Sequence, residues 1–319
     1  MTGDVGVGAD VVELAVRAAV RAPSPHNTQP WEFHAGPDGI EVFLDESRLL
    51  RVADPGGREA ALACGAALLN MRIALEAAGH AATVEVLPDR TRPRLAGVVR
   101  IGGTHRPTPE QTRLAGAVAR RHTNRRPFLD RPVPAPARHA LTAAADHEGA
   151  RLVLLSTSEL DAFAALLRQA DHVQSEDAAF RAELGEWTHP GDRSDGVPAS
   201  AGGPRPPSSA LLALRDYGGP AAGREREFER DPLVGVLTTA GDTRRHWLLA
   251  GLAMERVLLA ATVAGLSASF LAQPIEVDPV RREVAALLAG RGHPQTALRI
   301  GYGYPGAATP RRPVEDVTG

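Results

Sequence analysis

The sequence of 319 residues contains no lysine, so all 36 of its basic residues are arginine. This absence excludes a P-loop NTPase, a pyridoxal phosphate enzyme and a protein kinase, because each of these classes needs a lysine at its reactive site. Cysteine is almost as scarce. The single Cys64 excludes an internal disulfide and any cysteine-rich zinc or iron–sulfur site. A cytoplasmic location is therefore the default expectation.

A surplus of positive charge and long hydrophobic runs are also lacking. The formal net charge is −2 at pH 7, so we expect no binding to nucleic acid or to an anionic membrane. Unbroken apolar stretches are shorter than the about 18 residues of a spanning helix, and we expect no signal peptide. The eleven histidines show no HExxH or other metal-ligand pairing, and no GxSxG elbow is present. The sequence thus predicts neither a metal site nor a serine hydrolase.

Helical and strand patterns alternate along the chain, which indicates an α+β fold. In the first half we expect a helix, a hairpin, a long Ala- and Leu-rich helix and two strands, at 10–22, 31–44, 57–79, 82–87 and 95–101. In the second half we expect helices and strands at 109–121, 135–147, 151–156, 158–182, 243–264 and 279–289, and three further strands. We predict two halves, residues 1–105 and 106–319.

The two halves resemble each other in sequence. A shift of 186 residues places Arg58 on Arg244, and in that ungapped frame two glycine pairs and a proline pair coincide: Gly65/Gly251, Gly79/Gly265 and Pro88/Pro274. Such self-similarity predicts a duplicated α+β unit in which each half buries one face against the other.

Residues 185–232 interrupt the second half with a stretch rich in Gly, Pro, Ser, Asp and Arg. So long a segment without periodicity is typical of a lid, a binding loop or disorder. Trp187 and Thr188, at its start, are candidates to line a substrate pocket.

Two loops carry groups suited to a ligand. RRHTNRRPF, residues 120–128, gathers guanidinium groups and a hydroxyl that suit a phosphate, and we expect Arg121 and Arg125 on a surface turn; the alternative is a solvated basic turn. PSPHNTQPW, residues 23–31, is rigid and neutral, so that its hydroxyl and amide groups suit the heteroatom edge of a planar ligand. The alternative is a stiff connection with Trp31 in the core.

These two loops, the AGLAMERVLL and AQPIE segments and the closing LRIGYGYP…TPRRPVEDV resemble the nitroreductase superfamily of FMN flavoproteins, and in particular its long single-chain Acg-like branch. The resemblance extends over about residues 10–316. Ordinary members are homodimers with two FMN sites built from both subunits. Here each half retains only one part of such a site, so the resemblance implies a nitroreductase-like pseudo-dimer with antiparallel or mixed sheets, long central helices and one composite FMN site. It also implies a monomeric pseudo-dimer, with further self-association left open, a small-molecule substrate and NAD(P)H as a candidate donor.

By this resemblance, the residues expected at the FMN phosphate are Arg121, Thr123, Arg125, Arg311 and Arg312. His122 is expected where the backbone meets the flavin ring. The ring contacts expected are Pro23, Ser24, Asn27 and Gln29, with Gln273, Pro274 and Ile275 against the ring face. No catalytic side chain is expected, because flavin N5 carries the hydride chemistry. The implied function is an FMN-dependent oxidoreductase; the alternative is a protein that sequesters FMN beneath a lid with little turnover.

Overall fold

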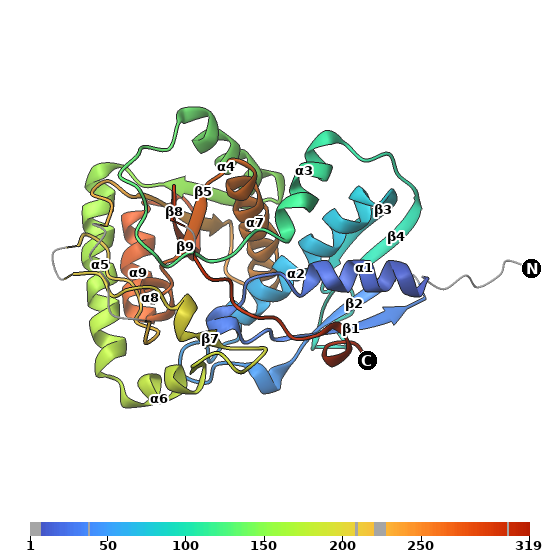
Figure 1. Cartoon of the computed structure of the whole chain (residues 1–319), viewed down its shortest axis with the longest axis horizontal. Coiled ribbons are helices and arrows are strands. Elements are labelled where there is room, and N and C mark those ends of the chain that lie inside the picture. Colours follow the sequence, from blue (N-terminus) through green and yellow to red (C-terminus); the bar gives the residue numbers. More distant parts are fainter. Residues whose placement is uncertain (1–7, 38, 208–209, 220–227, 305) are drawn as a thin grey trace, which may run out of the picture.

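The structure is a computed structural model that describes residues 8–37, 39–207, 210–219, 228–304 and 306–319 (Figure 1). Asp38, in the turn of the predicted hairpin, and parts of the 185–232 segment lie outside these residues. Two four-stranded antiparallel sheets form the framework. The first has the order β1 (Trp31–Gly36), β2 (Gly39–Leu44), β4 (Leu95–Thr104), β3 (His80–Val86). The second has the order β5 (Arg151–Leu154), β8 (Leu233–Thr239), β10 (His293–Gly301), β9 (Ser267–Phe270).

The two sheets are built alike. In each, a 20-residue helix connects the second strand to the third in the sequence: α2 (Arg58–Ala77) in the first half and α7 (Arg244–Val263) in the second. The bounds of α7 are those of α2 shifted by the 186 residues found in the sequence. The α+β fold class with antiparallel sheets and long central helices is therefore confirmed. The division at residue 105 stays a prediction, and Figure 1 shows the C-terminus returning to the first sheet, where the Phe33 amide donates to Val317 O (2.8 Å).

Further helices surround this framework. They are α1 (Ala9–Ala19), α3 (Pro109–Val118), α4 (Ala135–His147), α5 (Thr157–Glu176), α6 (Ala178–Glu186), α8 (Gln273–Glu276) and α9 (Asp278–Leu287). Short 3-10 turns lie at η1 (Pro25–Asn27), η2 (Glu46–Arg48), η3 (Ala199–Ala201) and η4 (Val314–Asp316), and the small strands β6 (Thr188–His189) and β7 (Val197–Pro198) pair in the inserted segment. The helix expected at 158–182 is divided, because the Asp177 carboxylate accepts from the Ala179 (2.8 Å) and Phe180 (3.3 Å) amides and caps α6.

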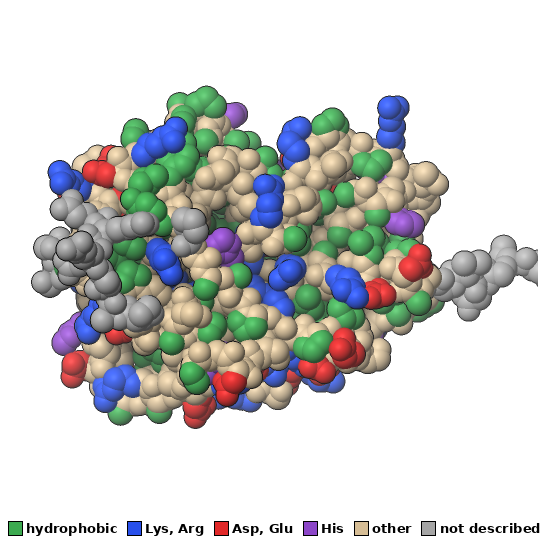
Figure 2. All heavy atoms as spheres, in the orientation of Figure 1, with side chains coloured by type: hydrophobic (Ala, Val, Ile, Leu, Met, Phe, Trp, Pro, Cys, Tyr) green, Lys and Arg blue, Asp and Glu red, His purple; other side chains and the backbone are tan. Residues whose placement is uncertain are grey.

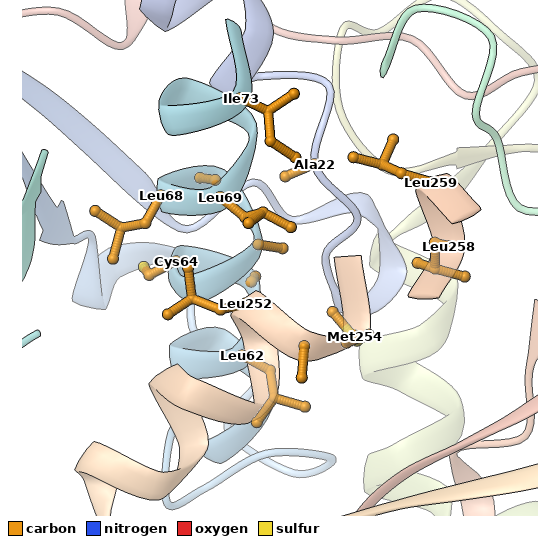
Figure 3. Packing of buried hydrophobic residues seen from close by; sticks show 14 of the residues in the cluster. Ala22, Leu62, Cys64, Leu68, Leu69, Ile73, Leu252, Met254, Leu258 and Leu259 are labelled. Atoms are coloured by element: carbon orange, nitrogen blue, oxygen red, sulfur yellow. The ribbon is translucent and has the colours of Figure 1, made fainter. Parts of the chain in front are cut away.

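Helices α2 and α7 pack against each other in the centre of the molecule (Figure 3). By length and mean hydropathy alone, both helices could cross a membrane, which the sequence analysis did not predict. In the fold, 78% and 67% of the most apolar windows of α2 and α7 are buried. The helices approach most closely at Gly65 and Gly251. A Cβ atom on Gly65 would lie 2.2 Å from Leu248 O, and one on Gly251 would lie 2.1 Å from Leu62 O. The repeated glycines are thus explained by backbone contact.

We expect Gly65→Ala and Gly251→Ala each to destabilise the protein by about 3 kcal/mol, because the added methyl group forces the central helices apart. Gly116→Ala is the matched control. Gly116 lies in the exposed part of α3 with nothing within 4 Å of an added Cβ, so its replacement should stabilise by about 0.5–1 kcal/mol. Denaturant unfolding measures the free energy of unfolding of all three variants. Equally small changes for Gly65→Ala, Gly251→Ala and Gly116→Ala would contradict the close approach of α2 and α7.

Candidate functional site

A cavity lies where the two halves meet. Its walls include Leu62 and Ala63 of α2 and Met254 of α7. The predicted site residues that line it are Pro23, Ser24, Thr123, Arg125 and Gln273. The structure therefore brings the PSPHNTQPW loop, the RRHTNRRPF loop and the AQPIE segment to one place, although they are about 100 and 250 residues apart in the sequence.

The loop over residues 23–29 has an unusual backbone. His26, Asn27 and Gln29 have φ values of 46°, 58° and 52°, in the left-handed region that non-glycine residues rarely adopt. Hydrogen bonds hold this conformation: Ser24 Oγ accepts from the Gln29 amide (2.9 Å), and Asn27 Nδ2 donates to Gly196 O (2.8 Å). A strained and fixed loop of this kind is typical of a ligand site.

Asn27 and Gln29 do not line the cavity, contrary to the expectation that they face a planar ligand. The Gln29 amide group donates to Ser194 O (2.9 Å) and accepts from the Arg312 amide (2.8 Å). Asn27 Oδ1 accepts from Arg311 Nη1 (2.9 Å). Both side chains instead fasten the loop to the inserted segment and to the C-terminal tail, segments too distant in sequence for the motif to indicate.

Arg125 lines the cavity without a carboxylate partner among the described residues. Its guanidinium lies 4.6 Å from the Tyr217 ring centroid and donates from Nη1 to Ala201 O (3.1 Å). Burial lowers the pKa of Arg125, and the nearby Arg215 lowers it further. A half-buried guanidinium without a counter-ion is a site at which an anionic ligand group gains energy.

Arg121 is buried, 7% exposed, and so the expectation of a surface turn was wrong for this residue. Arg121 Nε lies 3.3 Å from Oε1 of Glu255, which is fully buried in α7, and Nη2 donates to Arg21 O (2.6 Å). Burial raises the pKa of Glu255 to about 7, although Arg121 opposes this rise. Arg121 is buried because it compensates the charge of Glu255 on α7, and no pattern in the sequence indicated a carboxylate at that buried position.

Arg311 of the C-terminal tail lies in a cluster of cations with Arg121 and Arg21, whereas Arg312 lies near Arg48 and several carboxylates. Burial lowers the pKa of Arg311 to about 9, and the positive charges of Arg121 and Arg21 lower it further. Nε of Arg311 and Nη1 of Arg312 are buried and have no hydrogen-bond acceptor in the described part of the chain, whereas Nε of Arg121 faces the Glu255 carboxylate. Unsatisfied buried guanidinium donors fit a phosphate, which accepts several charge-assisted hydrogen bonds.

A second charged cluster, which sequence reasoning missed, lies on another wall of the cavity. Arg215, from the inserted segment, donates to both carboxylate oxygens of Glu276 (3.1 and 2.5 Å) and to Gln174 Oε1 (2.9 Å). Glu59, at the start of α2, also lines the cavity. Burial lowers the pKa of His26 to about 3, so this ring is neutral. AQPIE contained Glu276, but no periodicity in the inserted segment distinguished Arg215.

The other predicted residues lie outside the cavity. His122 borders a separate space with Leu258 and Thr262, and its Nδ1 is 3.0 Å from Arg120 O. Pro274 is buried and Ile275 belongs to the core beneath the second sheet. Trp187 packs beside Phe180 with Arg48 and Arg193 each 5.6 Å from its ring. Thr188 borders an outer pocket of about 480 Å³.

Leu214, Arg215 and Tyr217 separate this outer pocket from the cavity, since they line both. The space left inside the cavity is about 90 Å³. Ligand sites typically measure about 300–1,000 Å³. The cavity is therefore smaller than a typical ligand site, and these three residues form the wall between it and the outer pocket.

The structure is thus a single chain with two similar α+β halves, in which a cavity is lined by residues of both central helices. No family model matches the chain. A Mycobacterium tuberculosis H37Rv protein with the provisional name NAD(P)H nitroreductase Acg is 34% identical over 98% of this chain and 97% of its own length. A second protein of that strain, also provisionally named an NAD(P)H nitroreductase, is 35% identical over 97% of this chain and 91% of its own.

The chain belongs to the Acg-like nitroreductase family, as its motifs predicted. A solved nitroreductase with bound FMN from Bacteroides fragilis NCTC 9343 is 17% identical, with a TM-score of 0.37 over 63% of this chain and 93% of that one. That likeness is too slight to support an argument, so the assignment rests on the full-length relatives.

Proposed function

We propose that the protein is an FMN-dependent oxidoreductase of nitroreductase type, which binds one FMN in the composite cavity. The observation that carries this proposal is the half-buried Arg125, which lines the cavity without a carboxylate partner among the described residues and lies beside a rigid neutral loop. A phosphate at one end and a planar uncharged ring at the other match these two surfaces. The names of the two mycobacterial relatives suggest NAD(P)H as the donor and a nitro compound as an acceptor.

In this proposal Thr123 and Arg125 bind the phosphate directly, with Arg121 and the tail arginines completing the positive environment. Pro23, Ser24 and Gln273 position the ring. When bound, FMN supplies the capacity to accept and deliver a hydride. The inserted segment excludes water. The face in Figure 2 exposes both acidic and basic side chains, which suits a small-molecule substrate better than a polyanion.

One FMN per chain follows from a difference between the halves. The connection from α1 to β1 is the PSPHNTQPW loop, whereas α4 runs into β5 through residues 148–150. At that junction the Glu148 carboxylate lies 2.5 Å from Arg72 Nη2 and 2.7 Å from Arg256 Nε. By the 186-residue shift, Arg256 matches Asn70 of α2. The Glu148 carboxylate thus neutralises the two arginines of this junction, and no loop equivalent to PSPHNTQPW precedes β5.

A second candidate function is FMN storage without turnover, and the Arg215–Glu276 pair favours it. This buried pair fastens the inserted segment over the cavity. A segment that remains closed over bound FMN would keep NAD(P)H from the ring.

The two functions are distinguished by adding NADPH anaerobically to purified protein. A yellow protein whose flavin band bleaches rapidly is the expected result and supports the oxidoreductase. A yellow protein that does not bleach supports storage. A colourless protein that binds no added FMN would overturn both.

A further inference from the structure

Glu59 is a carboxyl group held at the cavity wall by the start of α2. The helix start is fixed because Asp54 Oδ2 accepts from the Ala60 amide (2.9 Å) and the Arg58 guanidinium donates to Gln295 O. The Glu59 side chain is 11% exposed and shares the cavity with the apolar Leu62. In the described residues its side chain has one hydrogen-bond partner, Arg58, whose Nη2 donates to Glu59 Oε1 (3.0 Å) while Nη1 donates to Gln295 O.

Glu276 lines the same cavity in a different environment. Burial raises the pKa of Glu276, but Arg215 and the Gln174 amide (2.6 Å) outweigh burial, and the pKa falls below its ordinary value. Glu276 is therefore a carboxylate at neutral pH. Two carboxyl groups whose surroundings drive their pKa values apart are the usual arrangement of an acid beside a permanent anion.

The groups facing Glu59 come from every neighbouring element: Arg58 of α2, Asp54 of the preceding loop, Glu276 of α8 and Arg215 of the inserted segment, while the neutral His26 adds no charge. Burial raises the pKa of Glu59 to about 8, Glu276 and Asp54 add to the rise, and Arg58 and Arg215 oppose it. Glu59 thus retains its proton at pH 7 and loses it as the pH rises through about 8.

We infer that Glu59 is a catalytic acid that donates its carboxyl proton to the acceptor bound in the cavity. The inference rests on the proposed function and names its acceptor class: an organic molecule, such as a quinone, that must gain a proton with a hydride. The quinone gains two electrons and one hydrogen as the hydride originating from NAD(P)H, and its oxygen takes the second hydrogen from Glu59. A neutral hydroquinone leaves, and the Glu59 carboxylate regains a proton from solvent.

The first test needs no cofactor. Infrared spectra of the protein should show a protonated carboxyl band with two components, one that disappears as the pH rises through about 7, from Glu255, and one that disappears through about 8. Only the second component should be missing in Glu59→Gln. Glu148→Gln is the matched control: Glu148 is also buried, but Arg72 and Arg256 keep it ionised and it does not line the cavity, so the band should persist. A Glu59→Gln protein that retains the full band would overturn the inference.

The second test separates proton donation from a structural effect. In the FMN-loaded, NADPH-reduced protein, Glu59→Gln should slow reduction of benzoquinone by about 10²–10⁴-fold and remove the decline of the rate above pH 8. Oxidation by ferricyanide, which takes electrons without a proton, should be unchanged, as should FMN affinity. Loss of both rates, or a benzoquinone rate and pH profile equal to wild type, would overturn the inference. A wild-type protein that binds no FMN would instead overturn the proposed function, and this inference with it.

Discussion

Arg125→Ala is expected to weaken FMN binding by about ten- to a hundredfold, corresponding to about 1.5–3 kcal/mol for one charge-assisted contact. The fold should survive, because Arg125 is half-buried and has no carboxylate partner among the described residues; the contacts that are lost are those with Tyr217 and the hydrogen bond to Ala201 O. Titration of apo-protein with FMN, followed by flavin fluorescence, measures the loss.

Two controls make this result specific. Affinity for riboflavin, which lacks the phosphate, should change by less than about twofold in Arg125→Ala, since no phosphate contact is lost. Arg126 is the neighbouring residue of the same loop, but it is exposed and does not line the cavity. Arg126→Ala should therefore leave FMN affinity near wild type. Equal losses for riboflavin and FMN would show that Arg125 does not bind the phosphate.

Arg121→Ala is expected to destabilise the protein by about 3–5 kcal/mol at pH 8.5, because it leaves the fully buried Glu255 without its cation. This differs from the surface role that the sequence suggested, in which only ligand affinity would suffer. Unfolding in guanidinium chloride measures the change.

The destabilisation should depend on pH. Glu255 has a folded pKa of about 7, above its ordinary 4.5, so in the wild type its burial removes stability as the pH rises from about 4.5 to 7 and removes no more above that. Without Arg121 the folded pKa rises further, and the loss continues above pH 7 by up to about 1.4 kcal/mol per pH unit. Arg311 and Asn70 also face Glu255 and remain. In the double variant Arg121→Ala/Glu255→Gln, this additional loss of stability above pH 7 should be absent. A difference in unfolding free energy between wild type and Arg121→Ala that is constant from pH 6 to 8.5 would contradict the pairing of Arg121 with Glu255.

The sequence predicted the framework well where local pattern and packing agree. The alanine-rich composition of α2 and α7 and their paired glycines indicated two equivalent central helices, because helices can approach this closely only at small residues. The motif loops around Ser24, Thr123 and Gln273 were also predicted to meet, and they line one cavity.

The remaining parts of the site depend on contacts between distant segments. Asn27 binds Gly196 O and Arg311, partners about 170 and 280 residues away. Arg121 lies buried beside Glu255 of the central helix α7. A local motif does not indicate any of these distant partners, and its polar residues by themselves predict exposed side chains. Arg215 lies in a segment without periodicity, so its ion pair with Glu276 was not predictable either. The cytoplasmic location and the monomeric state stay predictions.

The central claim is that one composite site between two fused halves binds one FMN, and native mass spectrometry tests it most directly. The account predicts that protein saturated with FMN carries a single flavin per 319-residue chain, and that Arg125→Ala lowers its occupancy. Two flavins per wild-type chain would contradict the account.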